Sequence, residues 1–365
     1  MPSLQRRALS GPHLAPAGLA LLAAFLFGAS TPASKLLLGE LEPFALAGLL
    51  YLGAALLLAA IMLGGGPGGG GLWLPRDRHN RMRLLGSVVC GGVLGPVLLL
   101  YGLRAASAAS VSIWLNLETV ATALLAVLFF REQLSRLTWL ANGGVCLAGV
   151  LLSLGEGWSG LTPGLLVAAA CLCWGLDNNL TSLIDGITPA KATLWKGLVA
   201  GGMNLGIGLT LGAPPPALAA GEALVLGGLA YGGSITLYIT AAQRLGASRS
   251  QTIFASSPFF GLALALAFLR EQLTLWQAAA ALVLVASLWL MFREEHDHEH
   301  VHEAGTHAHG HEHADEHHAH EHPDEKTMGR ASAWHVHHRV VHRHPHWPDL
   351  HHRHQHERRG AEPPA

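Results

Sequence analysis

Long apolar runs recur along most of this chain, and each is long enough to cross a lipid bilayer as a helix. Charged residues make up 13% of the 365 residues, about half the share found in a soluble domain. We therefore expect an all-α integral membrane protein of about ten transmembrane helices. The predicted spans lie near 14–34, 43–63, 82–103, 107–130, 136–154, 161–184, 190–212, 222–243, 248–269 and 274–292.

Lysine and arginine are unevenly distributed between the two sides of the predicted bundle. With a cytoplasmic N-terminus, the cytoplasmic connections carry 12 of them and the opposite side carries 3. Positive charge in short loops favours the cytoplasm, so we expect a multi-pass protein of the bacterial inner (cell) membrane with both termini cytoplasmic. The first run follows Arg6 and Arg7 and has the charge of a signal peptide, but its length favours a retained span.

A short motif occurs twice in the sequence, each time at the end of one apolar run and the start of the next. Phe129 to Leu134 reads FFREQL, and Phe268 to Leu273 reads FLREQL, 139 residues later. Five spans separate the two copies, and an odd number of spans inverts the second half relative to the first. Inverted halves are typical of transporters in which one central site opens alternately to each side.

Three segments make the chain resemble the drug/metabolite transporter (DMT) superfamily, and within it the EamA-type permeases. They are FGASTPASK at residues 27–35, LNLE at residues 115–118 with its following Arg-Glu pair, and WGLDNNLT at residues 174–181. The resemblance implies two inverted five-helix EamA-like repeats and a permease function. The expected organisation is a cytoplasmic N-terminal segment (1–13), the first repeat (14–154), the second repeat (161–292) and a cytoplasmic tail (293–365).

Charged and amide side chains inside the predicted spans are the candidate substrate or coupling residues. A carboxylate near the midplane of the bilayer is costly, and Glu118 lies in the middle of its span. It either couples transport to protons or contacts substrate, or it is a structural carboxyl bonded to a neighbouring helix. Asp177, Asn178 and Asn179 follow one another, so they cannot all face one cavity on a helix. We favour Asp177 and Asn178 as pocket-lining residues.

Four further positions complete the candidate set. Asn116 belongs to the motif that contains Glu118, and Trp174 is able to wall an apolar pocket. Lys35 ends the first span, where the family often has lysine; it either pairs with a carboxylate or, as we favour, snorkels to the membrane surface. Pro258 lies inside an apolar run, where it removes a backbone donor and breaks the helix.

The tail after the last span is rich in histidine. Of 24 histidines, 22 lie at or after His296, many of them at every second position. Such spacing in an extended chain favours binding of Zn, Ni, Co or Cu, although no cofactor is required for the membrane part. The tail lacks the apolar residues of a core, so we expect disorder. The candidate metal ligands are His296, His298, His300, His302, His307, His309, His311, His313, His344, His346, His351 and His352.

The sequence therefore predicts a secondary transporter of a small organic metabolite that works by alternating access, with proton coupling as one option. The expected partners are the solute, the lipid bilayer and divalent metal ions on the tail, with no nucleic acid, and the chain is a monomer or a homodimer. No nucleophile–base motif indicates an enzyme. Two alternatives remain open, namely a divalent metal (Ni/Co/Zn) exporter that uses the tail, and a non-transporting membrane sensor of metal or pH.

Overall fold

The computed structural model divides the chain into two compact units, residues 1–294 and residues 295–365, which are described separately below. The described residues are 14–64, 74–75, 77–130, 134–155, 157–184, 187–245, 250, 253–292, 296–302, 305–310, 332–337 and 340–346.

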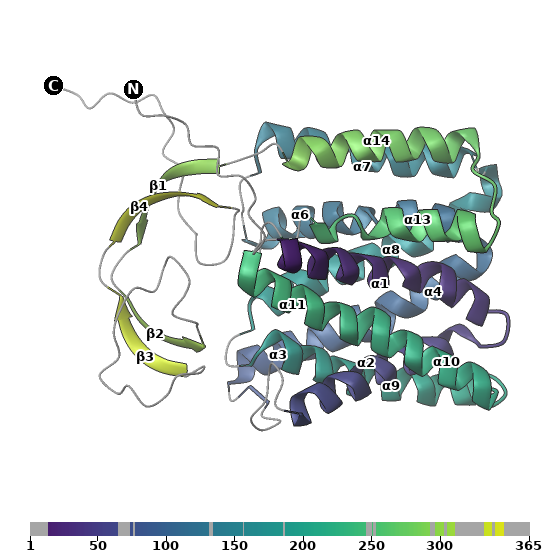
Figure 1. Cartoon of the computed structure of the whole chain (residues 1–365), viewed down its shortest axis with the longest axis horizontal. Helices are drawn as coiled ribbons and strands as arrows, with labels where there is room; N and C mark the ends of the chain where they lie inside the picture. The colour runs from purple at the N-terminus through teal and green to yellow at the C-terminus, as the bar shows by residue number, and fades with distance from the viewer. Residues whose placement is uncertain are drawn as a thin grey trace. The chain divides into compact units, whose positions relative to one another are not determined.

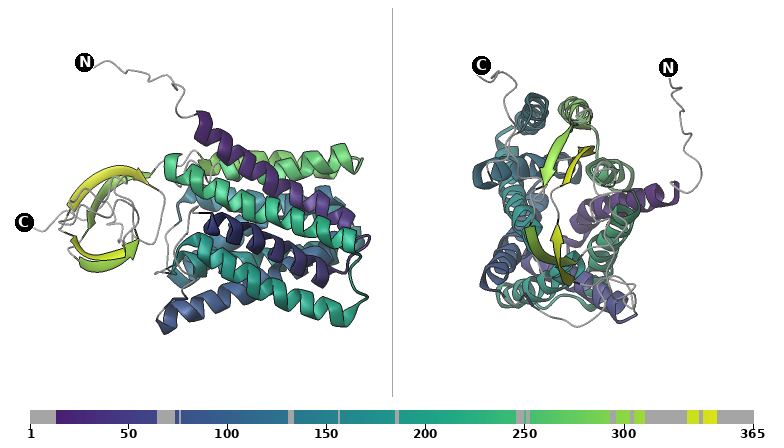
Figure 2. Two further views of the ribbon diagram at one scale, coloured as in Figure 1. Left: turned by 60° about the horizontal axis from the view of Figure 1, so that its bottom comes forward. Right: turned by 90° about the vertical axis from the view of Figure 1, so that its left-hand side faces the viewer.

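The first unit is a bundle of helices whose axes run side by side (Figures 1 and 2). In the first half of the chain they are α1 (Leu14–Leu37), α2 (Pro43–Leu63), α3 (Arg78–Ser87), η1 (Val88–Leu94), α4 (Gly95–Ala105), α5 (Ala108–Trp114), α6 (Leu117–Phe130) and α7 (Arg136–Gly155). In the second half they are α8 (Gly157–Ser182), α9 (Pro189–Leu211), α10 (Ala217–Gly227), η2 (Gly228–Gly233), α11 (Ser234–Leu245), α13 (Ser257–Phe268) and α14 (Leu275–Phe292).

Each of the ten predicted spans overlaps one helix or a run of consecutive helices, and within the ninth span, 248–269, α13 covers residues 257–268. Among the described residues, seven such helices are long and apolar enough to cross a membrane, and two shorter apolar helices cover 257–268 and 275–290. The remaining span, α9, is 23 residues long, and its two lysines and many glycines lower its hydropathy. The all-helical membrane architecture predicted from the sequence is therefore confirmed.

The third span of each half contains a stretch of π-helix at the same place. In η1 the N–H of Gly95 bonds to the carbonyl of Cys90, and at the end of η2 the N–H of Ser234 bonds to the carbonyl of Leu229. Each bond reaches five residues back instead of four, and the two sites are 139 residues apart. Because π-helical turns distort the regular backbone ladder, they are frequent at functional sites.

The fourth span of each half is interrupted near its middle. In the first half the N–H of Asn116 bonds to Ile113 and that of Thr119 bonds to Asn116. The same bonds recur exactly 140 residues later, from Ser256 and Phe259. Interrupted helices at matching positions of two halves are a pointer to a transport site.

Equivalent helices of the two halves pack against each other in antiparallel pairs. Along α2 and α9, Gly48 approaches Leu205 and Gly201 approaches Leu52, so the residue numbers rise on one helix as they fall on the other. Along α7 and α14, Gly144 meets Ser287 and Gly155 meets Trp276 in the same sense. These glycines lack a Cβ, which lets the backbones come close.

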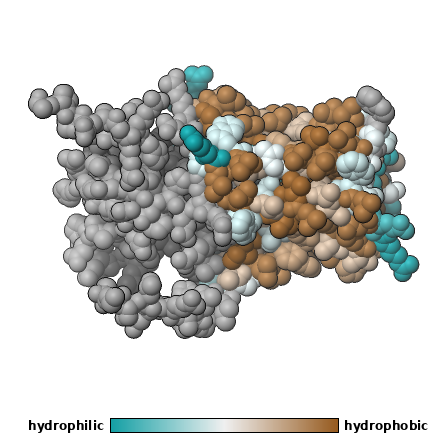
Figure 3. Space-filling model, turned by 90° about the horizontal axis from the view of Figure 1, so that it is seen from above, coloured by the Kyte–Doolittle hydropathy of each residue, from teal (hydrophilic) through white to brown (hydrophobic). Residues whose placement is uncertain are grey.

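The outer surface of the bundle is largely hydrophobic, with hydrophilic side chains gathered towards its ends (Figure 3). Leu56, Leu128 and Leu282 are more than half exposed. Such exposure of large apolar side chains is typical of a surface that faces lipid.

The second unit contains four short strands in two antiparallel pairs. β1 (His296–His302) pairs with β4 (Val340–His346), and β2 (Gly305–Gly310) pairs with β3 (Ser332–His337). The disorder expected for the tail stays a prediction. Alternating histidine has the two-residue period of a strand, and the register places His296, His298 and His300 opposite His346, His344 and His342.

Candidate functional site

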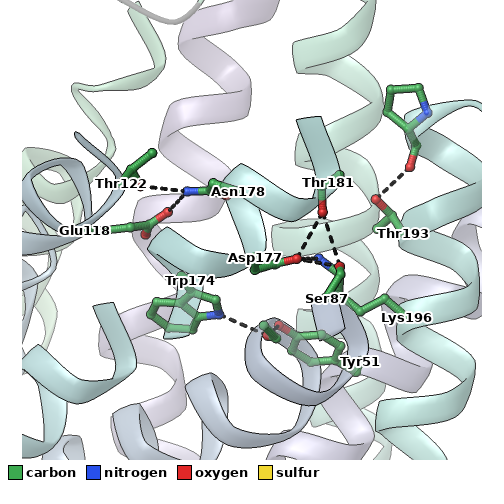
Figure 4. Close-up of polar contacts among 12 residues, drawn as sticks. Tyr51, Ser87, Glu118, Thr122, Trp174, Asp177, Asn178, Thr181, Thr193 and Lys196 are labelled. Atoms are coloured by element: carbon green, nitrogen blue, oxygen red, sulfur yellow. Dashed lines mark hydrogen bonds and ion pairs between the residues drawn. The ribbon is translucent and has the colours of Figure 1, made fainter. Parts of the chain in front are cut away.

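Polar side chains gather on one part of α8, towards its C-terminal end (Figure 4). α8 is a 26-residue helix whose earlier turns are apolar. Asp177, Asn178, Asn179 and Thr181 then follow within five residues. They contact α3, η1, α6 and α9 in different directions, because successive residues of a helix point about 100° apart.

Asp177 forms a buried ion pair with Lys196 of α9. The lysine Nζ lies 2.7 Å from Oδ1 and 2.5 Å from Oδ2 of the carboxylate. Ser87 Oγ of α3 and Thr181 Oγ1 also donate to Oδ1, at 2.5 Å and 3.0 Å. The carboxyl group is thus neutralised by one cation and held by two hydroxyl groups.

Gly91 of η1 makes the space that the Asp177 carboxylate occupies. A Cβ atom built on Gly91 would overlap the carboxylate of Asp177. Gly92 lies in the same way against Lys196, and Gly95 against the Trp174 ring. Because these three positions are glycines, the ion pair and the indole ring pack directly against the backbone of the π-helix.

The Gly91 carbonyl accepts two side-chain hydrogen bonds. Tyr51 Oη donates to it at 2.6 Å and Trp174 Nε1 at 3.0 Å. Pro96, five residues later, has no N–H with which to satisfy this carbonyl. Pro96 thus interrupts the backbone hydrogen bonds of its helix. The carbonyl that it leaves without a backbone donor accepts hydrogen bonds from aromatic side chains of α2 and α8 instead.

Glu118 forms a second and separate polar group with Asn178. Asn178 Nδ2 donates to Glu118 Oε1 at 2.8 Å and to Thr122 Oγ1 at 3.2 Å. Glu118 is half-buried, lies in the first turn of α6 just after the helix interruption, and Asn178 is exposed. In Figure 4 this group and the Asp177 group lie on opposite sides of α8.

The remaining amides bond mainly to nearby backbone. Asn116 Nδ2 donates to the carbonyls of Ser112 and Ile113, so it closes the turn between α5 and α6. Asn179 Nδ2 donates to Gly175 and Thr122 carbonyls, which ties α8 to α6. Both side chains are buried, and their bonds shape the interruption that presents Glu118.

Lys35 at the end of α1 reaches the end of α4, and the snorkelling favoured from the sequence stays a prediction. Its Nζ donates to the carbonyls of Leu103, Arg104 and Ala106, at 2.7, 3.2 and 2.7 Å. These carbonyls end α4 and lack helical donors, so a cation there both satisfies them and interacts favourably with the helix dipole. Lys35 is a helix cap rather than a pocket residue.

Pro258 lies in the first turn of α13, immediately after the interruption of its span. Its missing N–H costs nothing there, because that donor has no helical partner in a first turn. The position matches Glu118 of the first half. The two halves therefore share a backbone interruption but place different side chains after it.

Two charged residues that form several hydrogen bonds, Lys196 and Glu271, were not among the candidates chosen from the sequence. Lys196 was detectable as a charge inside a predicted span, but its partner on another helix was not. Glu271 accepts the backbone N–H groups of Ala108 and Ala109 at the start of α5, both at 2.8 Å. Its repeat-related residue, Glu132, lies outside the described residues.

The predicted metal ligands belong to the second unit. Eight of them lie within strands: His296, His298, His300 and His302 in β1, His307 and His309 in β2, and His344 and His346 in β4. The other four, His311, His313, His351 and His352, lie outside the described residues. All four cysteines are free.

Comparison with known proteins agrees with this architecture. The model of the EamA-like transporter family matches residues 15–155 and again residues 162–293. A curated relative from Methanothermobacter thermautotrophicus, described as an uncharacterized transporter, is 26% identical over 290 residues, which are 74% of this chain and 84% of the relative. A solved structure described as "Crystal structure of protein" has a TM-score of 0.55 at 15% identity, covering 76% of this chain and 96% of the other, and shows a shared fold.

Proposed function

This chain belongs to the EamA-like transporter family, and from that membership we propose that it is a secondary transporter that moves a small organic metabolite by alternating access with proton coupling. It is a multi-pass membrane protein, and the resemblance inferred from its sequence is confirmed. The identity of the solute class, the driving ion and the transport mechanism are parts of this proposal.

The observation that carries this proposal is a set of charged side chains placed inside the spans next to interrupted helices. Glu118 lies about halfway along the span Ala108–Phe129, and Asp177 pairs with Lys196 on the neighbouring helices. Burying charge in a bilayer costs several kcal/mol. A carboxylate such as Glu118, which has no cation bonded to it in the described part of the chain, persists where it lines a path for solute or ions, and this supports a transport role over a purely structural one.

Alternating access is supported by the relation between the halves. Equivalent helices α2 and α9, and likewise α7 and α14, cross antiparallel, as expected when one half is inverted relative to the other. Inverted halves provide two nearly equal packings around one site, and exchange between these packings opens the site to each side in turn.

The proposed orientation places both termini in the cytoplasm of a bacterial inner membrane. It rests on the excess of lysine and arginine in the connections on that side. Cysteine labelling tests it directly: a cysteine at position 131 should react from the cytoplasmic side and one at position 270 from the opposite side. Reaction of both from one side would contradict the inverted arrangement.

The transport function is tested in two steps. Growth of overexpressing and deleted strains on panels of toxic metabolites, amino acids and metals identifies a solute. Proteoliposomes that contain the full chain and an internal pH dye then measure flux of that solute with proton movement. We expect saturable flux that a pH gradient drives. A strain phenotype without flux in proteoliposomes would favour a sensor instead.

The tail is proposed to bind transition metals as an accessory to transport. The register of β1 on β4 brings histidines of the two strands to opposing positions, and imidazole suits Zn, Ni, Co and Cu. Removal of residues 296–365 should abolish multi-site Zn binding in solution and leave organic solute flux intact. Loss of metal efflux together with the tail would instead favour the metal exporter.

A further inference from the structure

We propose that Glu118 is the exchange site of this transporter, binding either a proton or the ammonium group of an organic amine, so that the substrate is a singly charged cation. The inference rests on the proposed transport function and goes further by naming the substrate class. It distinguishes the two in-span carboxylates, which the sequence had treated alike.

The charge balance around α8 is uneven. Two carboxylates, Glu118 and Asp177, lie on opposite sides of α8, and Lys196 lies on the Asp177 side (Figure 4). Lys196 is bonded to Asp177, and no lysine or arginine in the described part of the chain forms an ion pair with Glu118. Glu118, Asp177 and Lys196 together therefore carry one negative charge that is not balanced. One monocation bound at Glu118 makes the sum of their charges zero. An anionic substrate would add to the imbalance instead.

Asp177 is unsuited to exchange because it is saturated and enclosed. Its carboxylate accepts bonds from Ser87, Thr181 and Lys196. The residue is 6% exposed, and the backbone of Gly91 lies so close that a single methyl group would not fit between them. No room is left for an ammonium group, so this pair serves as fixed structure.

Glu118 has the opposite surroundings. Its carboxylate accepts one side-chain hydrogen bond in the described part of the chain, from Asn178, and Asn178 itself is exposed. Asn178 lies four residues before the end of α8, and an exposed amide there implies contact with water, because an amide facing lipid would be costly. A ligand in that water can reach the carboxylate.

The side chains near Glu118 indicate what kind of group the substrate carries beside its ammonium group. Trp174 lies four residues before Asn178 on α8, so the two share one face of the helix. Its indole N–H is bonded to the Gly91 carbonyl, which fixes the orientation of the ring. An amine with an apolar or aromatic body would place its cation at Glu118 and its body against this ring.

Other titratable groups near Glu118 do not provide the missing cation. Cys171 on α8 and Tyr51 on α2 are neutral in their ordinary state, and Asp177 repels a second negative charge. Helix α7, which also packs against α6, carries Cys146 midway and Arg136 at its first position. One proton should therefore leave the Glu118 carboxyl group for each ammonium group that binds.

Binding to the purified full chain tests the inference. The probes are phenethylamine, a monocation at neutral pH, and phenylacetate and 2-phenylethanol, which carry a negative charge and no charge on the same body. We expect phenethylamine to bind, to release protons in weakly buffered solution, and to bind more tightly as pH rises. Phenylacetate and 2-phenylethanol should not release protons.

Substitution of the carboxylate then locates the site. Glu118→Gln should abolish proton release and weaken phenethylamine binding by about 10-fold or more, because a charge-assisted bond is lost. Glu118→Asp should retain release, which separates loss of the site from loss of folding. Glu222→Gln is the matched control, since Glu222 is an exposed carboxylate on α10.

Three results would overturn the inference. They are binding of phenylacetate in preference to phenethylamine, proton release that survives in Glu118→Gln, and absence of phenethylamine binding by the folded wild-type chain. Each leaves the transporter itself intact if proteoliposomes still carry the solute identified in growth assays. Loss of all solute flux in wild-type proteoliposomes would instead contradict the proposed function.

Discussion

The two halves of the membrane unit share their backbone features but differ in the side chains that these features present. Each half has a π-helical stretch in its third span and an interruption in its fourth. At η2, Phe27 of α1 packs on Tyr231, whereas at η1 Trp174 of α8 donates a hydrogen bond to the Gly91 carbonyl. Around Tyr231 the neighbours are aromatic, with Tyr51 stacked nearby.

This difference shows that two halves with the same backbone features can carry different polar and charged side chains. Tyr231 of η2 corresponds to Gly92 of η1, 139 residues earlier, so η2 carries a ring where η1 has a glycine that lies against Ala200 and Lys196. Ser30 occupies the place in α1 that Asp177 has in α8, three residues after the aromatic residue of an aromatic-Gly pair in both.

Breaking the ion pair should have the largest effect. Lys196→Met leaves Asp177 buried without its cation, which costs about 3–5 kcal/mol, and the thermal unfolding midpoint in detergent should fall sharply. The double variant Asp177→Ser with Lys196→Leu copies the first half, where Ser30 and Leu50 occupy the corresponding places. It should recover at least half of the loss. A double variant as unstable as the single one would show that the halves are not interchangeable.

Filling the space at Gly91 should have the next largest effect. Gly91→Ala places a methyl group against the carboxylate of Asp177, and overpacking of this kind costs about 1–3 kcal/mol. Gly202→Ala on α9 is the control, because nothing lies within 4 Å of its Cβ position, so stability should stay level or rise. Equal thermal unfolding midpoints for the two variants would argue against close packing of the Asp177 carboxylate on Gly91 of η1.

Much of the fold could be predicted from the sequence, because span length and hydropathy are local properties. The positions of Glu118 and Asp177 within spans followed in the same way. Their different roles did not, since these depend on which other helix lies opposite. Lys196 is 19 residues from Asp177 and on another helix, and Lys35 meets carbonyls about 70 residues away. Only packing brings such groups together.

The corners between the fourth and fifth spans offer a third comparison. Glu271 accepts two backbone N–H groups at the start of α5, so Glu271→Gln removes one acceptor and the charge, at a cost of about 1 kcal/mol. The sequence repeat predicts that Glu132→Gln has a similar effect on the other side of the membrane. Thermal unfolding of both single variants measures this, and a neutral Glu132→Gln would mean that the second corner is held differently.

The smallest effect is expected where the third spans begin. Asp77 Oδ1 accepts the N–H of Asn80 and caps α3, whereas Pro216 at the start of α10 makes no side-chain cap bond. This backbone bond lowers the pKa of the Asp77 carboxyl below its ordinary value. A lowered folded-state pKa means that the cap stabilises α3 above the pKa of the unfolded chain and is lost as pH falls through the folded value. Hydrogen exchange at the start of α3 should therefore speed up in acid relative to the intrinsic rate, with no matching change at the start of α10. In Asp77→Asn the cap persists without a titrating group, so the acid effect should vanish there; an unchanged acid effect in that variant would assign it to another residue.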